Sequence, residues 1–387
     1  MKITEVISDT NIGGAGVLLA SLAEGLKNEF EIEVIMPRGS LLYNKMPSGI
    51  KITELQIAKD RSFSGADFPL FYRYFLKTKP DIIHTHASLT ARLAGKLATG
   101  AFCLSTRHCA RPIGKAAGTS PIKSKAYNFC TDLTVSTADF ATHNLIFEGV
   151  DENRIITIKN GSPDLKKCVT GATISVFESL GLSPDTKIIG SVARLEKVKG
   201  QDLILRAAPE ILAHFPKAHF LFLGAGSMKC EYKKLAANLG IEKNVTFLGF
   251  VDNPENYQQI FTVNVNSSRG TETSCLAISE CLSLGIPTVA SDFGGNTEMI
   301  KDFKNGFIFS SDNPHVLSCI IIRLLRDTAL YQKLSIGARE SYLKFFSRDR
   351  MIDDYKKLFH RLDSERQAKR RYARSRSSVL QNTADDR

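Results

Sequence analysis

The chain has 387 residues, of which 43% are hydrophobic and 24% are charged, a balance that indicates a globular protein and argues against disorder. Its length exceeds what one hydrophobic core usually fills, so two domains are expected. The formal net charge is +11, from 51 Lys and Arg against 40 Asp and Glu. This charge favours an anionic partner, such as nucleic acid, a phospholipid surface or a phosphorylated substrate, without choosing among them.

The start of the chain predicts no export signal and no membrane span. The stretch MKITEVISDTNIGG turns polar before an apolar segment of signal length forms, and no run approaches the roughly 18 apolar residues of a span. The eight cysteines are scattered without a C-x-x-C pair, which indicates reduced thiols and gives no support for a metal site. A cytoplasmic protein is therefore expected.

Short apolar runs alternate with amphipathic segments along most of the chain. The runs ITEVIS, IEVIMP, DIIHTH, CLSTRH and LTVST alternate with segments such as VLLASLAEGLKNEF and LTARLAGKLATG. The rhythm pauses between about residues 162 and 184 and then repeats with KIIGSVARL, HFLFLGAG, NVTFLGF, FTVNVNSS and PTVASDF. This pattern predicts two doubly wound α/β domains with parallel sheets, in which ligands sit at the carboxyl ends of the strands.

The last helical segment, over about residues 348–371, carries an apolar stripe and ends in a basic run. The stripe needs a surface to cover, and it consists of Met351, Tyr355, Leu358 and Leu362. The basic run ERQAKRRYARSR has two interpretations, a solvated tail and a contact with anionic lipid. Nucleic acid is disfavoured, because no known nucleic-acid-binding motif accompanies the run. The predicted segments are 1–165, 166–345, a return helix at 346–364 and a flexible basic tail at 365–387.

Two glutamates, Glu272 and Glu280, flank the start of a predicted helix in RGTETSCLAISECLSLG. The eight-residue step between them spans about 12 Å along a helix, comparable to the reach from the sugar to the ribose of a nucleotide diphosphate sugar. Free amides in the first helical turn lie between them and could hold phosphate. These amides belong to Ser274, Cys275 and Leu276. The alternative is structural, with Glu272 stabilising the helix N-terminus and Glu280 facing solvent.

Two cations and a pair of glycines accompany these glutamates. Arg194 and Lys199 in SVARLEKVKG follow a predicted strand, where they could neutralise a diphosphate leaving group. Taken alone, this stretch is an ordinary basic loop. Gly294 and Gly295 in DFGGNTEMI would let the backbone approach a ligand closely.

In this order, the motifs resemble those of glycosyltransferase family 4, whose members are retaining enzymes with the GT-B fold. They are most similar to the members that act in bacterial cell-surface polysaccharide or lipopolysaccharide biosynthesis. The resemblance covers about residues 2–362. It implies two Rossmann-like domains that face a cleft, an acceptor-side first domain, a nucleotide-sugar-binding second domain, and a C-terminal helix that crosses back to the first. It also implies that Glu272 contacts donor sugar hydroxyls, that Glu280 contacts the ribose, and that Arg194 and Lys199 bind the diphosphate.

In the first domain the resemblance assigns a histidine and three glycines to the candidate site. STRHCA is similar to the family's strand-end motif, so His108 is the catalytic candidate that positions the reacting sugar, with a structural role as the alternative. His84 and His86 in DIIHTHAS match a recurrent family pattern and are interpreted as scaffold or cleft wall. NIGGAG resembles the family's glycine-rich loop, whose glycines would lie near the cleft: Gly13, Gly14 and Gly16.

The sequence departs from the family pattern near the first glutamate. Thr273, Ser274 and Cys275 stand where members often carry Gly-Phe-Gly, and Thr297 stands in place of a proline. The backbone amides survive these changes. Donor binding is therefore expected to persist, while the identity of the sugar stays open.

The resemblance implies transfer of a sugar from a nucleotide diphosphate sugar, with UDP-sugars favoured, to a glycan or lipid-linked glycan with retention of configuration. No Asp-x-Asp occurs in the chain, so activity without a metal or other cofactor is expected. FPLFYRYFLKTKP and RPIGKAAGTSPIKSKAY mix basic and apolar residues in the first domain. They favour a lipid-linked acceptor and peripheral contact with an anionic membrane, at the inner face of the plasma membrane.

Three other classes of protein share parts of the pattern. A Rossmann dehydrogenase would carry G-x-G-x-x-G after the first strand, which GGAG lacks. A two-domain solute-binding protein would normally be exported. A non-catalytic ligand- or membrane-binding protein would explain the charge, but it leaves the ordered charged residues without a purpose. Donor turnover distinguishes these classes.

Overall fold

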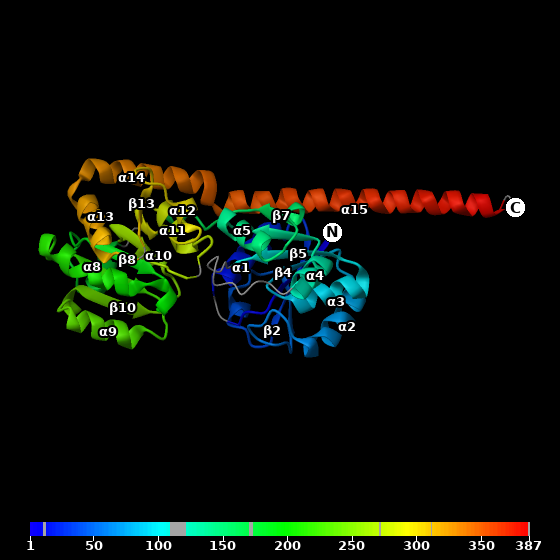
Figure 1. Ribbon diagram of the computed structural model, residues 1–387, viewed down its shortest axis with the longest axis horizontal. Helices are drawn as coiled ribbons and strands as arrows, with labels where there is room; N and C mark the ends of the chain where they lie inside the picture. The colour runs from blue at the N-terminus through cyan, green and yellow to red at the C-terminus, as the bar shows by residue number, and fades with distance from the viewer. Residues whose placement is uncertain (11–12, 109–120, 170–172, 271, 311, 386–387) are drawn as a thin grey trace.

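The computed structural model describes residues 1–10, 13–108, 121–169, 173–270, 272–310 and 312–385, with residues 121 and 369–385 described by their backbone alone. Two β-sheets organise the chain, one in each of two domains that lie side by side (Figure 1). Every pair of neighbouring strands in both sheets is parallel. The prediction of two doubly wound α/β domains is confirmed.

The first sheet has seven strands and reverses its order between β1 and β4. In spatial order the strands are β3 (Lys51–Leu55), β2 (Glu31–Pro37), β1 (Lys2–Ile7), β4 (Ile82–His86), β5 (Phe102–Arg107), β6 (Leu133–Ser136) and β7 (Ile155–Thr157). The five residues that follow Lys2 in β1 are buried, because helices cover both faces of the sheet. One of these buried residues is an acid, Glu5, in an otherwise largely apolar strand.

The second sheet has six strands and reverses between β8 and β11. In spatial order the strands are β10 (Val245–Gly249), β9 (His219–Leu223), β8 (Ile188–Val192), β11 (Val263–Asn266), β12 (Thr288–Ser291) and β13 (Gly306–Phe309). Such a reversal opens a crevice at the carboxyl ends of the two strands beside it, which is where ligands bind in this type of fold.

The helices cover the two faces of each sheet. In the first domain they are α1 (Gly14–Leu26), α2 (Phe68–Thr78), α3 (Leu89–Thr99), α4 (Pro121–Cys130) and α5 (Asp139–Phe147). Two short helices, α6 (Leu165–Cys168) and α7 (Thr173–Ser179), lie between β7 and β8 in the chain. The second domain has α8 (Gln201–His214), α9 (Lys229–Asn238), α10 (Glu255–Gln258), α11 (Leu276–Ser283), α12 (Asn296–Met299), α13 (Pro314–Arg326) and α14 (Thr328–Ser341).

The last helix, α15 (Arg348–Asp385), crosses back over the first domain (Figure 1). Its predicted apolar stripe is buried in one cluster with residues of β1 and α1, such as Ile3 and Leu22. The helix continues to Asp385, past the predicted helical segment of about residues 348–371, and residues 365–385 contain no glycine or proline to stop it. The predicted segment boundaries stay predictions. Within the described residues, none of the helices is both long and apolar enough to cross a membrane.

The helix predicted to begin at Ser274 instead begins at Leu276, so that prediction is wrong by two residues. Glu272 lies in the loop before α11, which agrees with its expected place at the entrance of the helix. The residues before Leu276 are instead bonded to the first domain. Thr273 Oγ1 donates a hydrogen bond to the backbone oxygen of His108, and the backbone oxygen of Ser274 accepts one from the side-chain amide of Asn160.

Candidate active site

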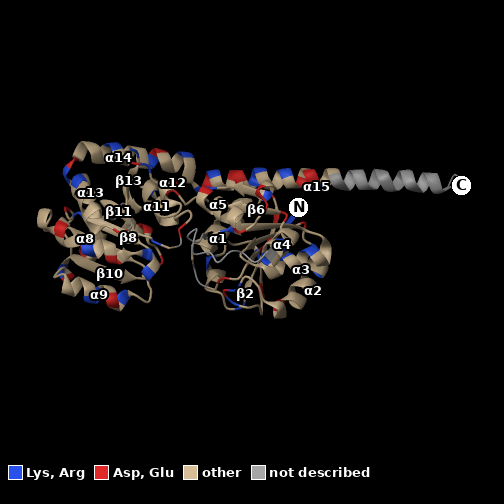
Figure 2. Ribbon diagram, in the orientation of Figure 1, with Lys and Arg blue, Asp and Glu red and all other residues tan. Residues whose placement is uncertain are grey.

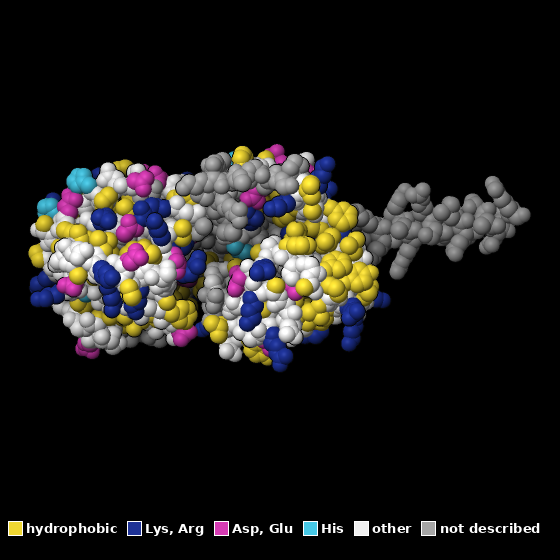
Figure 3. All heavy atoms as spheres, turned by 60° about the horizontal axis from the view of Figure 1, so that its bottom comes forward, with side chains coloured by type: hydrophobic (Ala, Val, Ile, Leu, Met, Phe, Trp, Pro, Cys, Tyr) yellow, Lys and Arg dark blue, Asp and Glu magenta, His cyan; other side chains and the backbone are white. Residues whose placement is uncertain are grey.

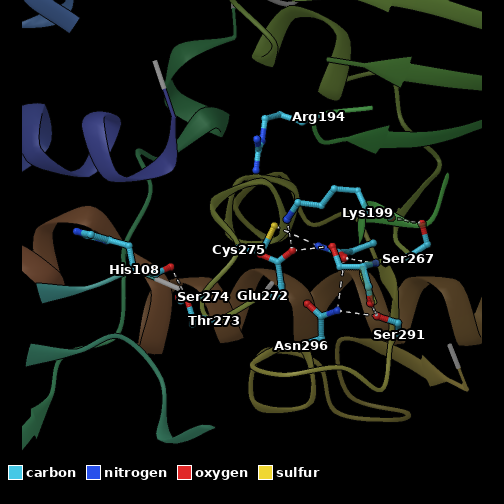
Figure 4. Close-up of polar contacts among 12 residues, drawn as sticks. His108, Arg194, Lys199, Ser267, Glu272, Thr273, Ser274, Cys275, Ser291 and Asn296 are labelled. Carbon is cyan, nitrogen blue, oxygen red and sulfur yellow. Dashed lines mark hydrogen bonds and ion pairs between the residues drawn. The ribbon is translucent and has the colours of Figure 1, made fainter. Parts of the chain in front are cut away.

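The predicted charged residues of the second domain gather at the carboxyl edge of its sheet, where the strand order reverses. Arg194 and Lys199 follow β8, and Glu272 follows β11, the neighbouring strand. Residues 73 positions apart in the sequence thus meet, and Lys199 Nζ donates to Glu272 Oε2 across 2.7 Å. Figure 4 shows Arg194, which is exposed, pointing toward the Lys199 side of this pair.

The Lys199–Glu272 pair is held in place by its surroundings. Glu272 is buried, and its Oε2 atom also accepts a hydrogen bond of 2.7 Å from Ser268 Oγ. Ser267 Oγ donates to the backbone oxygen of Lys199, which ties the loop after β8 to the loop after β11. Only 14% of the Lys199 side chain is exposed. A charge pair this shielded interacts more strongly than one on the open surface.

A second group of polar residues fixes the loop after β11, and sequence reasoning missed it. Asn296 Nδ2 donates to Ser291 Oγ across 3.0 Å, and Asn266 Oδ1 accepts from the backbone amide of Ser268 across 3.1 Å. All four residues are buried. They come from two stretches of the chain, the end of β11 with the loop after it and the end of β12 with α12 (Figure 4). A hydrogen bond from Ser291 Oγ to the backbone oxygen of Ser268 joins the two stretches, and no local spacing in the sequence reveals this link.

The amides that were expected to hold phosphate lie between Glu272 and the first turn of α11. Among the described residues, none accepts a hydrogen bond from the backbone N–H groups of Ser274, Cys275 or Leu276. Open amides at a helix start, beside a lysine, can bind an anion. The Cys275 thiol is no nucleophile here, because burial and the nearby Glu272 raise its pKa to about 12.

Glu280 lies inside α11, about two turns beyond Glu272 along the chain. It is half-buried, and its Oε2 atom accepts a hydrogen bond of 3.0 Å from Gln258 Nε2. Burial raises its pKa. Glu280 is therefore half-buried rather than fully exposed, and within the described residues its Oε1 atom accepts no hydrogen bond.

The two glycines of DFGGNTEMI pack against the backbone that carries Glu272. Gly294 has a positive φ of 58°, a conformation that favours glycine. The backbone amide of Gly295 donates to the backbone oxygen of Glu272, and a Cβ atom at Gly295 would lie 1.4 Å from the backbone oxygen of Thr273. These glycines thus shape the Glu272 loop, and their closest neighbours are protein backbone.

The first domain meets the site through His108, which directly follows β5. Its backbone oxygen accepts the Thr273 hydrogen bond, while its ring points away from Glu272 (Figure 4). The Nε2 atom of the ring lies 2.7 Å from Nδ1 of His86, and the two rings stack. Burial lowers the pKa of His108 well below its usual value, and the neighbouring His86 adds to this effect. The ring is therefore neutral at pH 7.

Behind His86 lies Glu5, a residue that the sequence analysis did not single out. Glu5 Oε2 is 3.0 Å from His86 Nε2, and Oε1 is 3.0 Å from His84 Nδ1. Burial alone would raise the pKa of Glu5, but the two histidines outweigh it and lower the pKa to about 2. A signal existed in the sequence, since an acid inside KITEVI and alternating histidines in IIHTH would face one another on adjacent parallel strands.

The glycine-rich loop is only partly at the domain boundary. A Cβ atom on Gly14 would lie 3.9 Å from Leu276 of the second domain, whereas one on Gly16 would meet Leu42 inside the first domain at 2.9 Å. A Cβ atom on Gly13 would meet no atom within 4 Å. Gly14 thus borders the second domain, Gly16 serves the packing of α1, and the place of Gly13 near the cleft stays a prediction.

Two clusters in the described part of the chain have the donor types that bind metals. In one, a ligand atom from each of Glu5, His84 and His86 lies within 4.8 Å of the others, but hydrogen bonds already use both nitrogens of each ring. The second cluster is half-buried to exposed and consists of Glu210, His315 and Cys319. Neither cluster includes a residue of the predicted donor site.

Comparison with known proteins gives matches over most of the chain. Residues 12–163 match the family model described as Glycosyltransferase Family 4, and residues 173–341 match the model described as Glycosyl transferases group 1. The two matches fall on the two domains. Both parts of the candidate site, around His108 and around Glu272, lie within the matched residues.

Full-length relatives support the same assignment. An uncharacterized glycosyltransferase of Methanocaldococcus jannaschii is 26% identical, covering 89% of this chain and 93% of its own. The N-acetyl-alpha-D-glucosaminyl L-malate synthase of Bacillus anthracis is 22% identical, covering 90% of this chain and 94% of its own. The crystal structure of Anabaena HepE in complex with UDP superposes with a TM-score of 0.79 at 19% identity, over 93% of this chain and 100% of that one.

Proposed function

Since the chain belongs to glycosyltransferase family 4 and has the GT-B fold, we propose that it transfers a sugar from a UDP-sugar to a glycan or lipid-linked glycan. We further propose that the transfer retains the anomeric configuration and serves cell-surface polysaccharide synthesis. The observation that carries the donor-binding part is the buried Lys199–Glu272 pair at the strand-order reversal of the second domain.

The proposed division of roles follows from charge. As the bond between sugar and diphosphate breaks, negative charge grows on the departing phosphate. Lys199, Arg194 and the amides at the start of α11 would receive this charge. Glu272, which already bonds Lys199, would hold donor sugar hydroxyls beside the phosphate, and Glu280 would hold the ribose farther along the helix.

The first domain would supply the acceptor side. Thr273 joins the donor loop to His108 across the domain boundary, so a sugar held near Glu272 lies close to the end of β5. Attack by an acceptor hydroxyl on the same face from which the diphosphate leaves would give retention, and no protein nucleophile is assigned. Anomer analysis of the product by NMR tests retention, and an inverted product would contradict it.

Donor preference can be tested by thermal shift with UDP, GDP and ADP. The proposal expects the largest stabilisation with UDP, in line with the UDP complex of HepE. It also expects that stabilisation to fall in the variant Lys199→Met and to persist in Lys197→Met, because Lys197 is exposed and lies two residues away. If none of the three nucleotides raises the melting temperature, donor binding at this site is contradicted.

The transfer is expected to need no divalent cation. The cationic groups proposed for the diphosphate are protein groups, and none of the residues proposed for the donor belongs to a cluster of metal-ligand type within the described residues. Treatment with EDTA should therefore leave the turnover rate within about twofold of the untreated value. Loss of activity that Mg²⁺ or Mn²⁺ restores would contradict this prediction.

An anionic membrane surface is proposed as the place where a lipid-linked acceptor is met. Exposed apolar side chains gather at the α2 and α3 end of the first domain in Figure 3, and include Leu70, Leu76 and Leu97. Arg73 and Lys77 are exposed beside them on α2. Elsewhere, Lys and Arg are spread over both domains rather than gathered on one face (Figure 2). Much of the second predicted contact stretch, at residues 111–127, lies outside the described residues.

Sedimentation with lipid vesicles tests this contact. We expect the chain to pellet with vesicles that contain anionic lipid, with binding that weakens as salt rises. The double variant Leu70→Ser/Leu76→Ser should reduce the bound fraction severalfold. Lys234→Ser, an exposed change in α9 of the second domain, is the matched control. Binding that is equal for neutral and anionic vesicles, or equal for both variants, would contradict the proposed surface.

A further inference from the structure

A buried chain of hydrogen bonds runs from the return helix to the candidate active site. It begins at Tyr355 on α15, whose hydroxyl is 3.1 Å from Thr106 Oγ1, and continues to His84 Nε2, 2.7 Å from the same oxygen. Glu5 then joins the two histidines of β4, and His86 ends the chain against His108. All of these residues except His108 are buried.

The order of donors along this chain is fixed at its centre. An ionised carboxylate can only accept hydrogen bonds, so Glu5 requires a hydrogen on His84 Nδ1 and another on His86 Nε2. A neutral imidazole carries a single N–H, so Nδ1 of His86 is then bare. The short contact at 2.7 Å requires that His108 carries its hydrogen on Nε2 and donates it to His86.

We propose that Glu5, acting through His86, holds His108 in the neutral tautomer with hydrogen on Nε2, which leaves Nδ1 as an acceptor for a substrate hydroxyl. Glu5 and His86 are thus positioning residues, and His84 and His86 are more than scaffold. The part that concerns substrate rests on the proposed function. The tautomer itself does not, since it follows from the hydrogen-bond geometry of the three histidines and Glu5.

The electrostatics of the cluster support this assignment. Burial lowers the pKa of both His86 and His108, which keeps both rings neutral. The pKa of Glu5 is about 2, which keeps the carboxylate ionised. Within the part of the chain that the structure describes, the titratable groups that face the three rings are Glu5 from β1 and Tyr355 from α15. Burial raises the pKa of Tyr355, so that its hydroxyl stays protonated.

The direct test is long-range ¹H–¹⁵N NMR of the full chain with ¹⁵N-labelled histidine at pH 7, without donor and in the presence of EDTA. The signals of His108 are assigned by their loss in His108→Gln. The proposal expects a protonated Nε2 and a bare Nδ1 for His108, and the same for His86. A hydrogen on Nδ1 of His108, a doubly protonated ring, or a change of these signals on adding Zn²⁺ would overturn it.

Variants of His86 separate positioning from support of the fold. His86→Gln keeps an amide that can donate to Glu5 but places no group against His108, whereas His86→Asn keeps a group near the former Nδ1 position. We expect His86→Gln to give His108 a mixture of tautomers and to lower kcat about tenfold or more, with partial rescue in His86→Asn. An unchanged His108 tautomer in His86→Gln would overturn the proposal, as would an unchanged kcat.

Glu5→Gln tests the carboxylate, and Glu33→Gln is its matched control. An amide N–H in the place of Oε1 cannot accept from His84 Nδ1, and a neutral amide oxygen accepts more weakly than a carboxylate, so Glu5→Gln is expected to populate a second tautomer of His84 or of His86. Glu33 is a buried carboxylate on the neighbouring strand β2, bonded to Thr53, and should leave the histidine spectrum unchanged. Unchanged tautomers of both rings in Glu5→Gln would overturn the role of Glu5. A failure of donor turnover would remove the proposed function and leave the tautomer result intact.

Discussion

Replacement of Glu272 with glutamine is expected to lower kcat about 100- to 1,000-fold while the protein stays folded. The change keeps the shape of the side chain and removes its charge. The Lys199 ammonium group would then lose the carboxylate that it contacts at 2.7 Å, and donor sugar hydroxyls would lose a charged acceptor. Steady-state release of nucleotide diphosphate measures the effect, and circular dichroism checks the fold.

A double-mutant cycle shows whether Glu272 and Lys199 act as one unit. The proposed contact predicts that Lys199→Met and Glu272→Gln together cost much less than the product of their separate effects. Lys197→Met, two residues away and exposed, is the matched control and should keep the wild-type rate. Additive effects, or a Glu272→Gln variant within twofold of wild type, would contradict the assigned site.

Gly295→Ala is expected to lower the melting temperature by roughly 5 °C or more and to abolish stabilisation by donor nucleotide. A Cβ atom here would lie 1.4 Å from the backbone oxygen of Thr273, so the loop that carries Glu272 must move. Because the obstacle is backbone, no side-chain rotation can relieve the clash. Differential scanning fluorimetry with and without UDP measures both effects.

The matched control for this change is Gly65→Ala. Gly65 is exposed, and a Cβ atom there would meet no atom within 4 Å. Its melting temperature should stay within about 1 °C of wild type, because an exposed change of this kind removes no contact. A Gly295→Ala variant that melts and binds UDP like the wild type would show that the glycine does not shape the donor loop.

The fold could be predicted from the sequence because its signals are local. Apolar runs separated by amphipathic segments identify buried parallel strands and their crossover helices without any knowledge of contacts. The stripe that includes Met351 and Tyr355 similarly required a surface, which the first domain provides. The start of α11 could not be predicted, because it depends on bonds from Thr273 and Ser274 to residues more than 100 positions away.

The candidate site could be predicted only where its residues stand in recognisable motifs. Lys199 and Glu272 were expected near one ligand, and the structure brings them into direct contact. Glu5 was missed, because its significance depends on His84 and His86, which the topology places on the adjacent strand about 80 residues later. Asn296 was missed for the same reason, since one of its hydrogen-bond partners is Asn266, which lies at the end of β11 and 30 positions earlier in the chain.

The most direct test of the account is incubation of the purified chain with a panel of UDP-, GDP- and ADP-sugars, scoring release of the nucleotide diphosphate for wild type and Glu272→Gln. The account predicts release with a UDP-sugar that the Glu272→Gln variant loses almost entirely. Release that the variant retains in full, or no release from any sugar of the panel with a glycan acceptor present, would contradict it.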